Sequence, residues 1–183
     1  LKLDLNNHTT QIEPHDYIAE ICNSINHINS ILLGFSQDIW TYISKNYFTQ
    51  MNIAGEIGSS TMPHKINPIN FENAEGNLGM SNALSHFFAN KLTVSRLQRD
   101  LSDSTVLRNL GLTFAYSTIA YKNLLLGLSK LDINKNRINI DIDNSWEVLA
   151  EPIQMVARKY HISNSYEYLK KFTRGKKVTK EII

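Results

Sequence analysis

The sequence has little cysteine and no large surplus of either charge. Cys22 is the only cysteine among its 183 residues, so no disulfide can form within the chain. It stands at helical spacing from Ile18 and Ile25, which predicts a small buried side chain rather than a nucleophile. The formal net charge is +2, and lysine and arginine form no run with interleaved aromatics. The composition therefore argues against a nucleic-acid-binding protein.

Clustered metal ligands and long uninterrupted apolar runs are also lacking. The six histidines are scattered, without the close His or Cys pairs that metal sites use, so no metal site is predicted. The most apolar stretch, residues 107–128, is interrupted by polar residues and does not suit a membrane span. It suits a helix in the middle of a large bundle. A single chain of 183 residues would cover such a helix poorly, so the stretch also predicts that subunits associate.

The chain begins at Leu1, with no initiator methionine and no basic segment followed by an apolar stretch. We expect that Leu1 is not the natural N-terminus and that further sequence precedes it. If further sequence precedes Leu1, the lack of a targeting signal in these residues says nothing about where the protein is located.

Hydrophobic periodicity predicts long helices in the first part of the chain. Apolar residues three or four apart between Ile18 and Ile43 indicate one amphipathic helix, which begins near Pro14 and ends near residues 46–48. A second helix is predicted over residues 70–92. Gly76 and Gly79 inside it indicate either close contact with another helix or a ligand, or a bent or frayed first half.

A third helix is predicted to open at about Ser104, after the charge-rich and irregular residues 93–103. Ser102 or Asp103 is its expected N-cap. The free backbone amides of its first turn, with Arg99 and Arg108 beside them, suit a phosphate group. A capped helix start with arginines nearby is more often only structural, so both interpretations stay open.

Residues 132–183 differ in character and predict a small helical domain, separate from residues 1–131. The segment 132–144 is rich in Asn and Asp and indicates a linker or a short helix. Two shorter helices follow it. Pro152 marks the start of the first or kinks it, Asn164 or Ser165 caps the second, and Gly175 ends it.

The segment GEIGSSTMPHKINP, residues 55–68, gathers flexible, nucleophilic, cationic and amide groups. Its glycines loosen the backbone and its prolines exclude a continuous helix. Such a segment suits a mobile loop that closes over an anionic substrate and holds a serine hydroxyl, Ser59 or Ser60, beside the cation of Lys65. A polar turn with two solvated serines explains the same spacing equally well.

The same segment resembles the signature loop of the fumarase, aspartase and argininosuccinase superfamily, in which two serines, Met-Pro, Lys and Asn stand at fixed spacing. Four further stretches resemble the adenylosuccinate lyase family in its bacterial-like branch: residues 10–20, 71–79, 95–109 and 146–154. The resemblance covers nearly the whole chain. It implies an all-α fold, with the C-terminal part of a long-helix bundle over residues 1–131 and a small helical C-terminal domain over residues 132–183.

The resemblance also implies an activity. Members of the family are carbon–nitrogen lyases of purine biosynthesis, which eliminate fumarate from adenylosuccinate to give AMP, and from succinylaminoimidazole carboxamide ribotide (SAICAR) to give AICAR. They need no metal or organic cofactor. The implied enzyme is a cytoplasmic homotetramer with no nucleic-acid or membrane partner, and each active site combines segments of three subunits. Residues 10–16, the signature loop and residues 99–108 are expected at different helix ends, so one monomer need not bring them together.

The resemblance assigns roles residue by residue. Ser59 matches the catalytic base, while the histidine that acts as the general acid is expected upstream of Leu1. His15 and Glu72 are expected beside the site, and Glu13 or Glu72 is expected to orient Lys65. The nucleotide phosphate is expected at Ser104 and Arg108. The substrate-binding positions are Gln11, Ser60, Lys65, Ile66, Asn67, Asn73, Arg99, Ser104, Thr105, Val106, Leu107 and Arg108.

Two alternatives remain at this point. The chain could be a helical nucleotide-binding or assembly module without catalysis, although such a module has no chemical need for Ser59, Lys65 and Asn67 together. It could also be another lyase of the superfamily. The segments around Ser104 and over residues 10–16 favour a nucleotide over malate, aspartate or argininosuccinate as the substrate.

Overall fold

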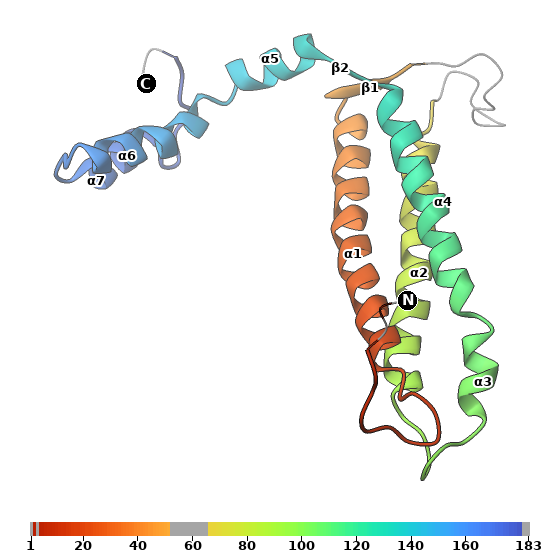
Figure 1. Ribbon diagram of the computed structural model, residues 1–183. Helices are drawn as coiled ribbons and strands as arrows, with labels where there is room; N and C mark the ends of the chain where they lie inside the picture. The colour runs from red at the N-terminus through yellow and green to blue at the C-terminus, as the bar shows by residue number, and fades with distance from the viewer. Residues whose placement is uncertain (1, 3, 52–65, 181–183) are drawn as a thin grey trace. The chain divides into compact units, whose positions relative to one another are not determined.

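The computed structural model describes residues 2, 4–51 and 66–180 of the chain (Figure 1). The expectations for Ser59, Ser60 and Lys65 lie outside the described residues. Two compact units divide the chain, Leu1–Asp132 and Ile133–Ile183. Helices dominate both units, and the predicted all-α fold class is confirmed. No helix in the described part of the chain is both long enough and apolar enough to cross a membrane.

Three long helices form the first unit: α1 (Asp16–Ser44), α2 (Ile69–Leu92) and α4 (Leu110–Ser129). Helix α2 packs against both α1 and α4 and is the central element of this bundle (Figure 1). The bounds of α1 and α2 lie close to those predicted from the sequence. Hydrophobic periodicity locates such helices because their repeat is a local property of the chain.

The segment between α2 and α4 differs from the prediction. Helix α3 (Ser102–Leu107) begins two residues before Ser104, and Leu101 occupies its N-cap position. The expectation that Ser102 or Asp103 is the N-cap is therefore wrong. Asp100 takes over the capping of this turn, because its Oδ1 accepts a hydrogen bond from the Ser102 backbone N–H at 2.8 Å and another from the Ser102 hydroxyl.

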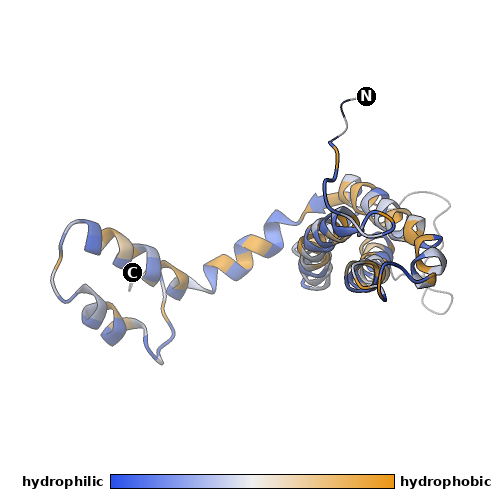
Figure 2. Ribbon diagram, turned by 60° about the horizontal axis from the view of Figure 1, so that its bottom comes forward, coloured by the Kyte–Doolittle hydropathy of each residue, from blue (hydrophilic) through white to orange (hydrophobic). Residues whose placement is uncertain are grey.

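Helix α4 is not buried all round within this chain. One narrow stripe of small and medium side chains faces α2, namely Thr113, Ser117, Ala120, Leu124 and Gly127. Large apolar side chains cover its other faces and are exposed, among them Leu112, Phe114, Ile119, Leu125 and Leu126. Figure 2 shows hydrophobic residues on the outside of the bundle as well as between its helices. Within the single chain, α4 is therefore buried on one side only, as expected for an apolar helix that one chain of this size covers poorly.

Two apolar clusters fill the bundle, with polar side chains between them. One cluster, around Phe71, Leu78 and Leu124, lies toward the N-terminal end of α2. The other lies toward its C-terminal end and includes Cys22 and Phe88. Cys22 is fully buried, as predicted.

The polar group between the clusters was not predicted. Asn29 of α1 donates hydrogen bonds to Ser81 of α2 at 3.1 Å and to Ser117 of α4 at 3.0 Å. Its side-chain oxygen accepts one from the Tyr121 hydroxyl at 2.6 Å. We name Asn29, Ser81, Ser117 and Tyr121 the polar network. It links all three long helices, because each of its buried groups finds its partner on a neighbouring helix.

A short two-stranded sheet closes one end of the bundle. It pairs β1 (Phe48–Gln50) with β2 (Leu131–Ile133), and neither strand was predicted from the sequence. The pairing continues from the Met51 backbone N–H to the Lys130 carbonyl oxygen at 2.8 Å. At the same end, the buried Lys130 Nζ donates to Asn70 Oδ1 at 3.0 Å. The ends of α1 and α4 are thereby tied to the start of α2.

The second unit consists of short helices: α5 (Lys135–Asp143), the 3-10 helix η1 (Trp146–Leu149), α6 (Ala150–Lys159) and α7 (Ser165–Thr173). Asn134 caps α5 by accepting a hydrogen bond from the Arg137 N–H at 3.1 Å. Pro152 lies in the first turn of α6 and so marks its start. Gly175, with φ of 72°, follows α7 as predicted. In the described part of this unit, only Ala157 and Val178 are buried.

Candidate functional site

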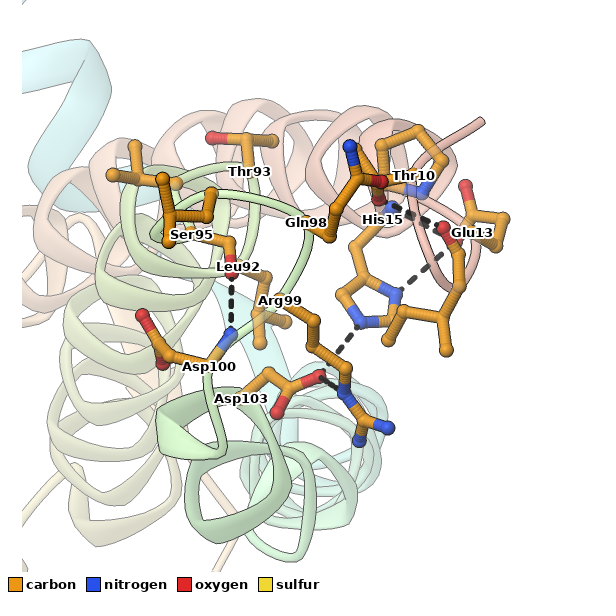
Figure 3. A pocket seen from close by; sticks show the side chains of 14 residues that line it. Thr10, Glu13, His15, Leu92, Thr93, Ser95, Gln98, Arg99, Asp100 and Asp103 are labelled. Atoms are coloured by element: carbon orange, nitrogen blue, oxygen red, sulfur yellow. Dashed lines mark hydrogen bonds and ion pairs between the residues drawn. The ribbon is translucent and has the colours of Figure 1, made fainter. Parts of the chain in front are cut away.

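A pocket lies at the end of the bundle where α1 begins and α2 ends (Figure 3). The loop before α1 and the segment between α2 and α3 form its walls. Its polar and charged lining residues include Thr10, Glu13, His15, Gln98, Arg99, Asp100 and Asp103. Because α1 and α2 are antiparallel, residues more than 80 positions apart in the sequence lie side by side here (Figure 1).

His15 stands at the junction between the pocket and α1. Its backbone is left-handed, with φ of 64°, and it occupies the N-cap position of the helix. Glu13 holds it twice, because one carboxylate oxygen accepts the His15 backbone N–H at 2.8 Å and lies 3.1 Å from the ring Nδ1. The turn that starts α1 therefore also holds the imidazole at the pocket.

Asp103 joins the two walls of the pocket. Its Oδ2 lies 3.4 Å from Arg99 Nε and 3.6 Å from His15 Nε2 (Figure 3). Its Oδ1 accepts the Ser104 backbone N–H at 2.6 Å. The Asp103 side chain is only 10% exposed to solvent, whereas the Arg99 side chain is 28% exposed. One carboxylate thus contacts both residues while the arginine stays partly open to solvent.

The two aspartates of the pocket have lowered pKa values. Hydrogen bonds from the Ser102 hydroxyl and backbone lower the pKa of Asp100 to about 2. Burial by itself would raise the pKa of Asp103, but the Ser104 N–H, the Arg99 charge and the contacts with His15 and Arg99 together lower it. Both groups are therefore ionised at neutral pH, and they hold arginines rather than act as proton donors.

The structure brings some of the predicted site residues together. Arg99 and His15 share the pocket, and the neighbours of Gln11 on either side, Thr10 and Ile12, line it. Ser104 is the residue whose backbone N–H reaches Asp103, and Thr105, Val106 and Leu107 continue α3, with Arg108 directly after it. Residues 10–16 and residues 99–108 end different helices, but these helix ends are adjacent, so one monomer brings these two of the three expected segments together.

Other predicted residues lie at the far end of α2. Ile66 and Asn67 precede Pro68, the N-cap residue of this helix, and Asn73 is exposed near its start. A helix of 24 residues is about 36 Å long, so this group is far from Arg99 within one chain. Asn73 accepts a hydrogen bond from Asn77 at 2.9 Å.

The two glutamates expected to orient Lys65 have other partners in the described residues. Glu13 contacts His15, and the Glu72 carboxylate accepts a hydrogen bond from Trp40 Nε1 at 3.1 Å. Glu72 belongs to the first turn of α2, at the opposite end of the bundle from His15. His15 and Glu72, both expected beside the site, therefore do not meet within one chain.

Glycines 76 and 79 have no close neighbour among the described residues of the chain. A Cβ placed at either position would meet nothing within 4 Å. Close approach occurs instead at Gly127 of α4, where a Cβ would lie 2.8 Å from Phe71 Cζ. Helix α2 is continuous through both glycines, so its first half is not frayed.

Sequence reasoning missed Asp100 and Asp103 as site residues. The charge spacing was a signal, because each aspartate follows an arginine by four residues, a distance at which opposite charges can pair. The two pairs are Arg96 with Asp100 and Arg99 with Asp103. The pairing with His15 gave no such signal, because it depends on the antiparallel packing of α1 and α2.

Comparisons with known proteins cover nearly the whole chain. The family model described as adenylosuccinate lyase C-terminal matches residues 95–183, and the model described as lyase matches residues 1–81. Adenylosuccinate lyase of Legionella pneumophila (strain Corby) is 61% identical over 181 residues, which are 99% of this chain and 40% of the relative. The enzyme of that name from Escherichia coli (strain K12) is 58% identical, with the same coverage. That of Buchnera aphidicola subsp. Schizaphis graminum is 62% identical over 96% of this chain and 38% of the relative. The chain spans about 40% of the length of these relatives.

Proposed function

This chain belongs to the adenylosuccinate lyase family, and on that basis we propose that it forms part of an enzyme that eliminates fumarate from adenylosuccinate to give AMP, and from SAICAR to give AICAR. The observation that carries the proposal is an identity of 61% over 99% of the chain to a protein of that name. The pocket supports it, because a partly open arginine in a polar recess suits a nucleotide anion.

The elimination requires a base, an acid and groups that stabilise a carbanion. Ser59 as the alkoxide removes the proton from the carbon next to a succinyl carboxylate, and Lys65 stabilises that alkoxide. The carbon–nitrogen bond then breaks, its electron pair goes to the amine nitrogen, and the remaining pair forms the double bond of fumarate. A histidine in the part of the protein that precedes this chain supplies the proton to the nitrogen.

The remaining predicted residues bind the substrate. Ser60, Lys65, Ile66 and Asn67 hold the succinyl carboxylates, and Gln11 and Asn73 complete the contacts. Arg99 with Ser104, Thr105, Val106, Leu107 and Arg108 binds the nucleotide, with its phosphate at Ser104 and Arg108. The shared pocket of His15 and Arg99, next to the start of α3, supports a nucleotide subsite at this end of the bundle.

The active enzyme is proposed to be a cytoplasmic homotetramer with composite sites. The length of α2 supports this, since Asn67 and Arg99 lie at opposite ends of a helix about 36 Å long. Another subunit would bring one group to the other. The exposed apolar faces of α4 supply a surface for such association. Residues 1–131 form the bundle domain of each subunit and residues 132–183 its small helical domain.

The first test is cleavage of adenylosuccinate, followed by ultraviolet absorbance, with the protein that includes the preceding segment. We expect Ser59→Ala to lower kcat by about 100-fold or more, because a positioned base contributes at least that factor. Ser24→Ala is the control, since that hydroxyl lies on the exposed side of α1 and donates only to the Glu20 carbonyl.

Retained activity in Ser59→Ala would refute the proposed base. Cleavage of malate, aspartate or argininosuccinate in place of adenylosuccinate would refute the substrate. A monodisperse monomer in light scattering would refute the tetramer.

A further inference from the structure

We propose that Asp103 is a positioning residue that orients the Arg99 guanidinium for the phosphate-bearing part of a nucleoside monophosphate. His15 is the second neighbour that holds the Asp103 carboxylate in place. The inference deepens the proposed function and rests on it. Asp103 itself was expected only as a helix cap, and its contacts give it a different role.

Arg99 contacts Asp103 through the inner nitrogen of its guanidinium and not through a terminal one. Asp103 meets Arg99 at Nε, 3.4 Å away, which is the inner nitrogen of the guanidinium. A guanidinium has five N–H donors in a rigid fork, and four of them lie on the two terminal nitrogens. The contact is an ion pair and not a hydrogen bond, since Arg99 Nε is buried without a hydrogen-bond partner in the described residues. It holds the inner edge of the guanidinium toward Asp103 and leaves the terminal donors for a bidentate contact with an anion.

A neighbouring pair shows that this geometry is not a consequence of spacing. Arg96 and Asp100 are also four residues apart, but Arg96 uses a terminal nitrogen, Nη1, at 3.3 Å. The Arg96 side chain is 83% exposed, whereas that of Arg99 is 28% exposed and lines the pocket. The Arg96 pair is a surface ion pair, and the Arg99 pair is built into the wall of the recess.

His15 lies on the other side of the Asp103 carboxylate, within ion-pair distance but without a hydrogen bond to it. Glu13 fixes the histidine through both backbone and ring, and the His15 Nε2 faces Asp103 Oδ2 at 3.6 Å. The Ser104 N–H binds the other carboxylate oxygen. Asp103 is thus anchored from the loop before α1 and from α3, so its orientation, and with it that of Arg99, is set before a ligand arrives.

The test measures AMP binding by titration calorimetry in the full-length protein, with wild type, Asp103→Asn and Arg99→Lys. We expect Asp103→Asn to weaken AMP binding by about tenfold or more, since loss of alignment is costly even when the charged group remains. The KM for adenylosuccinate should rise by a similar factor, with a smaller change in kcat. Asp141→Asn is the matched control, because it removes another carboxylate paired with an arginine four residues earlier, in α5.

The decisive readout is the double variant. Lysine lacks Nε and the fork, so Asp103→Asn should have little further effect in the Arg99→Lys background. Additive effects would show that Asp103 acts independently of Arg99 and would overturn the inference. If Asp103→Asn does not fold, Asp103→Glu replaces it, because this change keeps the charge but displaces the carboxylate, and the same weakening of AMP binding is expected.

Failure of the inference and failure of the proposed function give different results. Wild-type protein that binds AMP and cleaves adenylosuccinate, together with Asp103 variants that bind AMP equally well, would overturn only the positioning role. Wild-type protein that neither binds AMP nor cleaves adenylosuccinate would overturn both.

Discussion

The two ends of the α1–α2–α4 bundle are held together by different interactions. From the polar network to the β1–β2 sheet, close packing and neutral hydrogen bonds dominate, with Lys130 as a buried exception. We name this the closed part. The charged end comprises the loop before α1 and residues 93–109, where carboxylates pair with arginines and with His15 around an open pocket.

The comparison shows how one bundle separates stability from binding. Neutral partners in a dry interior are costly to remove, because a buried group left unpaired loses its solvation as well. Ion pairs near solvent contribute little to stability, but their charges remain available to a ligand. The closed part should therefore respond to substitution through stability, and the charged end through ligand affinity and pH.

The largest effect on stability is expected at the polar network. Asn29→Ala removes two donated hydrogen bonds and the acceptor for Tyr121, all of them at a fully buried position. We expect a loss of about 3 kcal/mol in the free energy of unfolding, because Ser117 and Tyr121 lose partners in the interior. Chemical denaturation measures this loss, which should vary little with salt.

Asn23→Ala is the control for this substitution. Asn23 lies on the exposed side of the same helix, so its replacement should change the free energy of unfolding by no more than about 0.5 kcal/mol. Equal losses in the two variants would remove the distinction between the closed part and the surface of α1.

A smaller loss is expected at Gly127 of α4, which packs tightly against Asn70 and Phe71 of α2. A Cβ there would lie 2.8 Å from Phe71 Cζ and 3.1 Å from Asn70 Cβ. We expect Gly127→Ala to destabilise the protein by about 1 to 3 kcal/mol through overpacking. Gly34→Ala, in the middle of α1 with nothing within 4 Å of the new Cβ, should instead stabilise it by up to about 1 kcal/mol. Thermal unfolding of both variants checks the opposite signs, and a gain in both would show that the closed part is loosely packed.

The smallest effect is expected at Asp100 and only in acid. Hydrogen bonds from Ser102 lower the pKa of this carboxyl from 3.8 to about 2, so the charged form stabilises the folded state. That contribution is present above the unfolded value and is lost as the pH falls toward 2. Wild-type protein should therefore lose stability more steeply than Asp100→Asn between about pH 4 and pH 2. Thermal midpoints across this range measure the difference, and a constant offset at all pH values would contradict the linkage.

The helices themselves were largely predictable from the sequence. The bounds of α1 follow from the periodic apolar residues between Ile18 and Ile43, and Gly175 correctly ends α7. The start of α3 was misplaced, because Asp100 rather than a residue within the turn caps it. The polar network was missed altogether, since Asn29 and Ser81 give no periodic apolar signal although both are fully buried.

The candidate site was predictable only in part. Arg99 and His15 follow from the resemblance of their segments to a known family, and the pairing of Arg99 with Asp103 has a visible spacing of four residues. The contact of Asp103 with His15 could not be predicted, because it spans 88 residues and arises only when α1 and α2 pack antiparallel. The roles proposed for Ser59 and Lys65 remain predictions.

The sequence by itself determined the local features of this protein: where the long helices run, that Cys22 is buried, and to which family the chain belongs. These follow from periodicity and from motifs read over short distances. The tertiary structure decided which helix ends meet, which side of α4 is covered, and that Asp103 links His15 to Arg99. The physical reason is that these features depend on packing between segments far apart in the chain, and an amphipathic pattern specifies a buried face without specifying its partner.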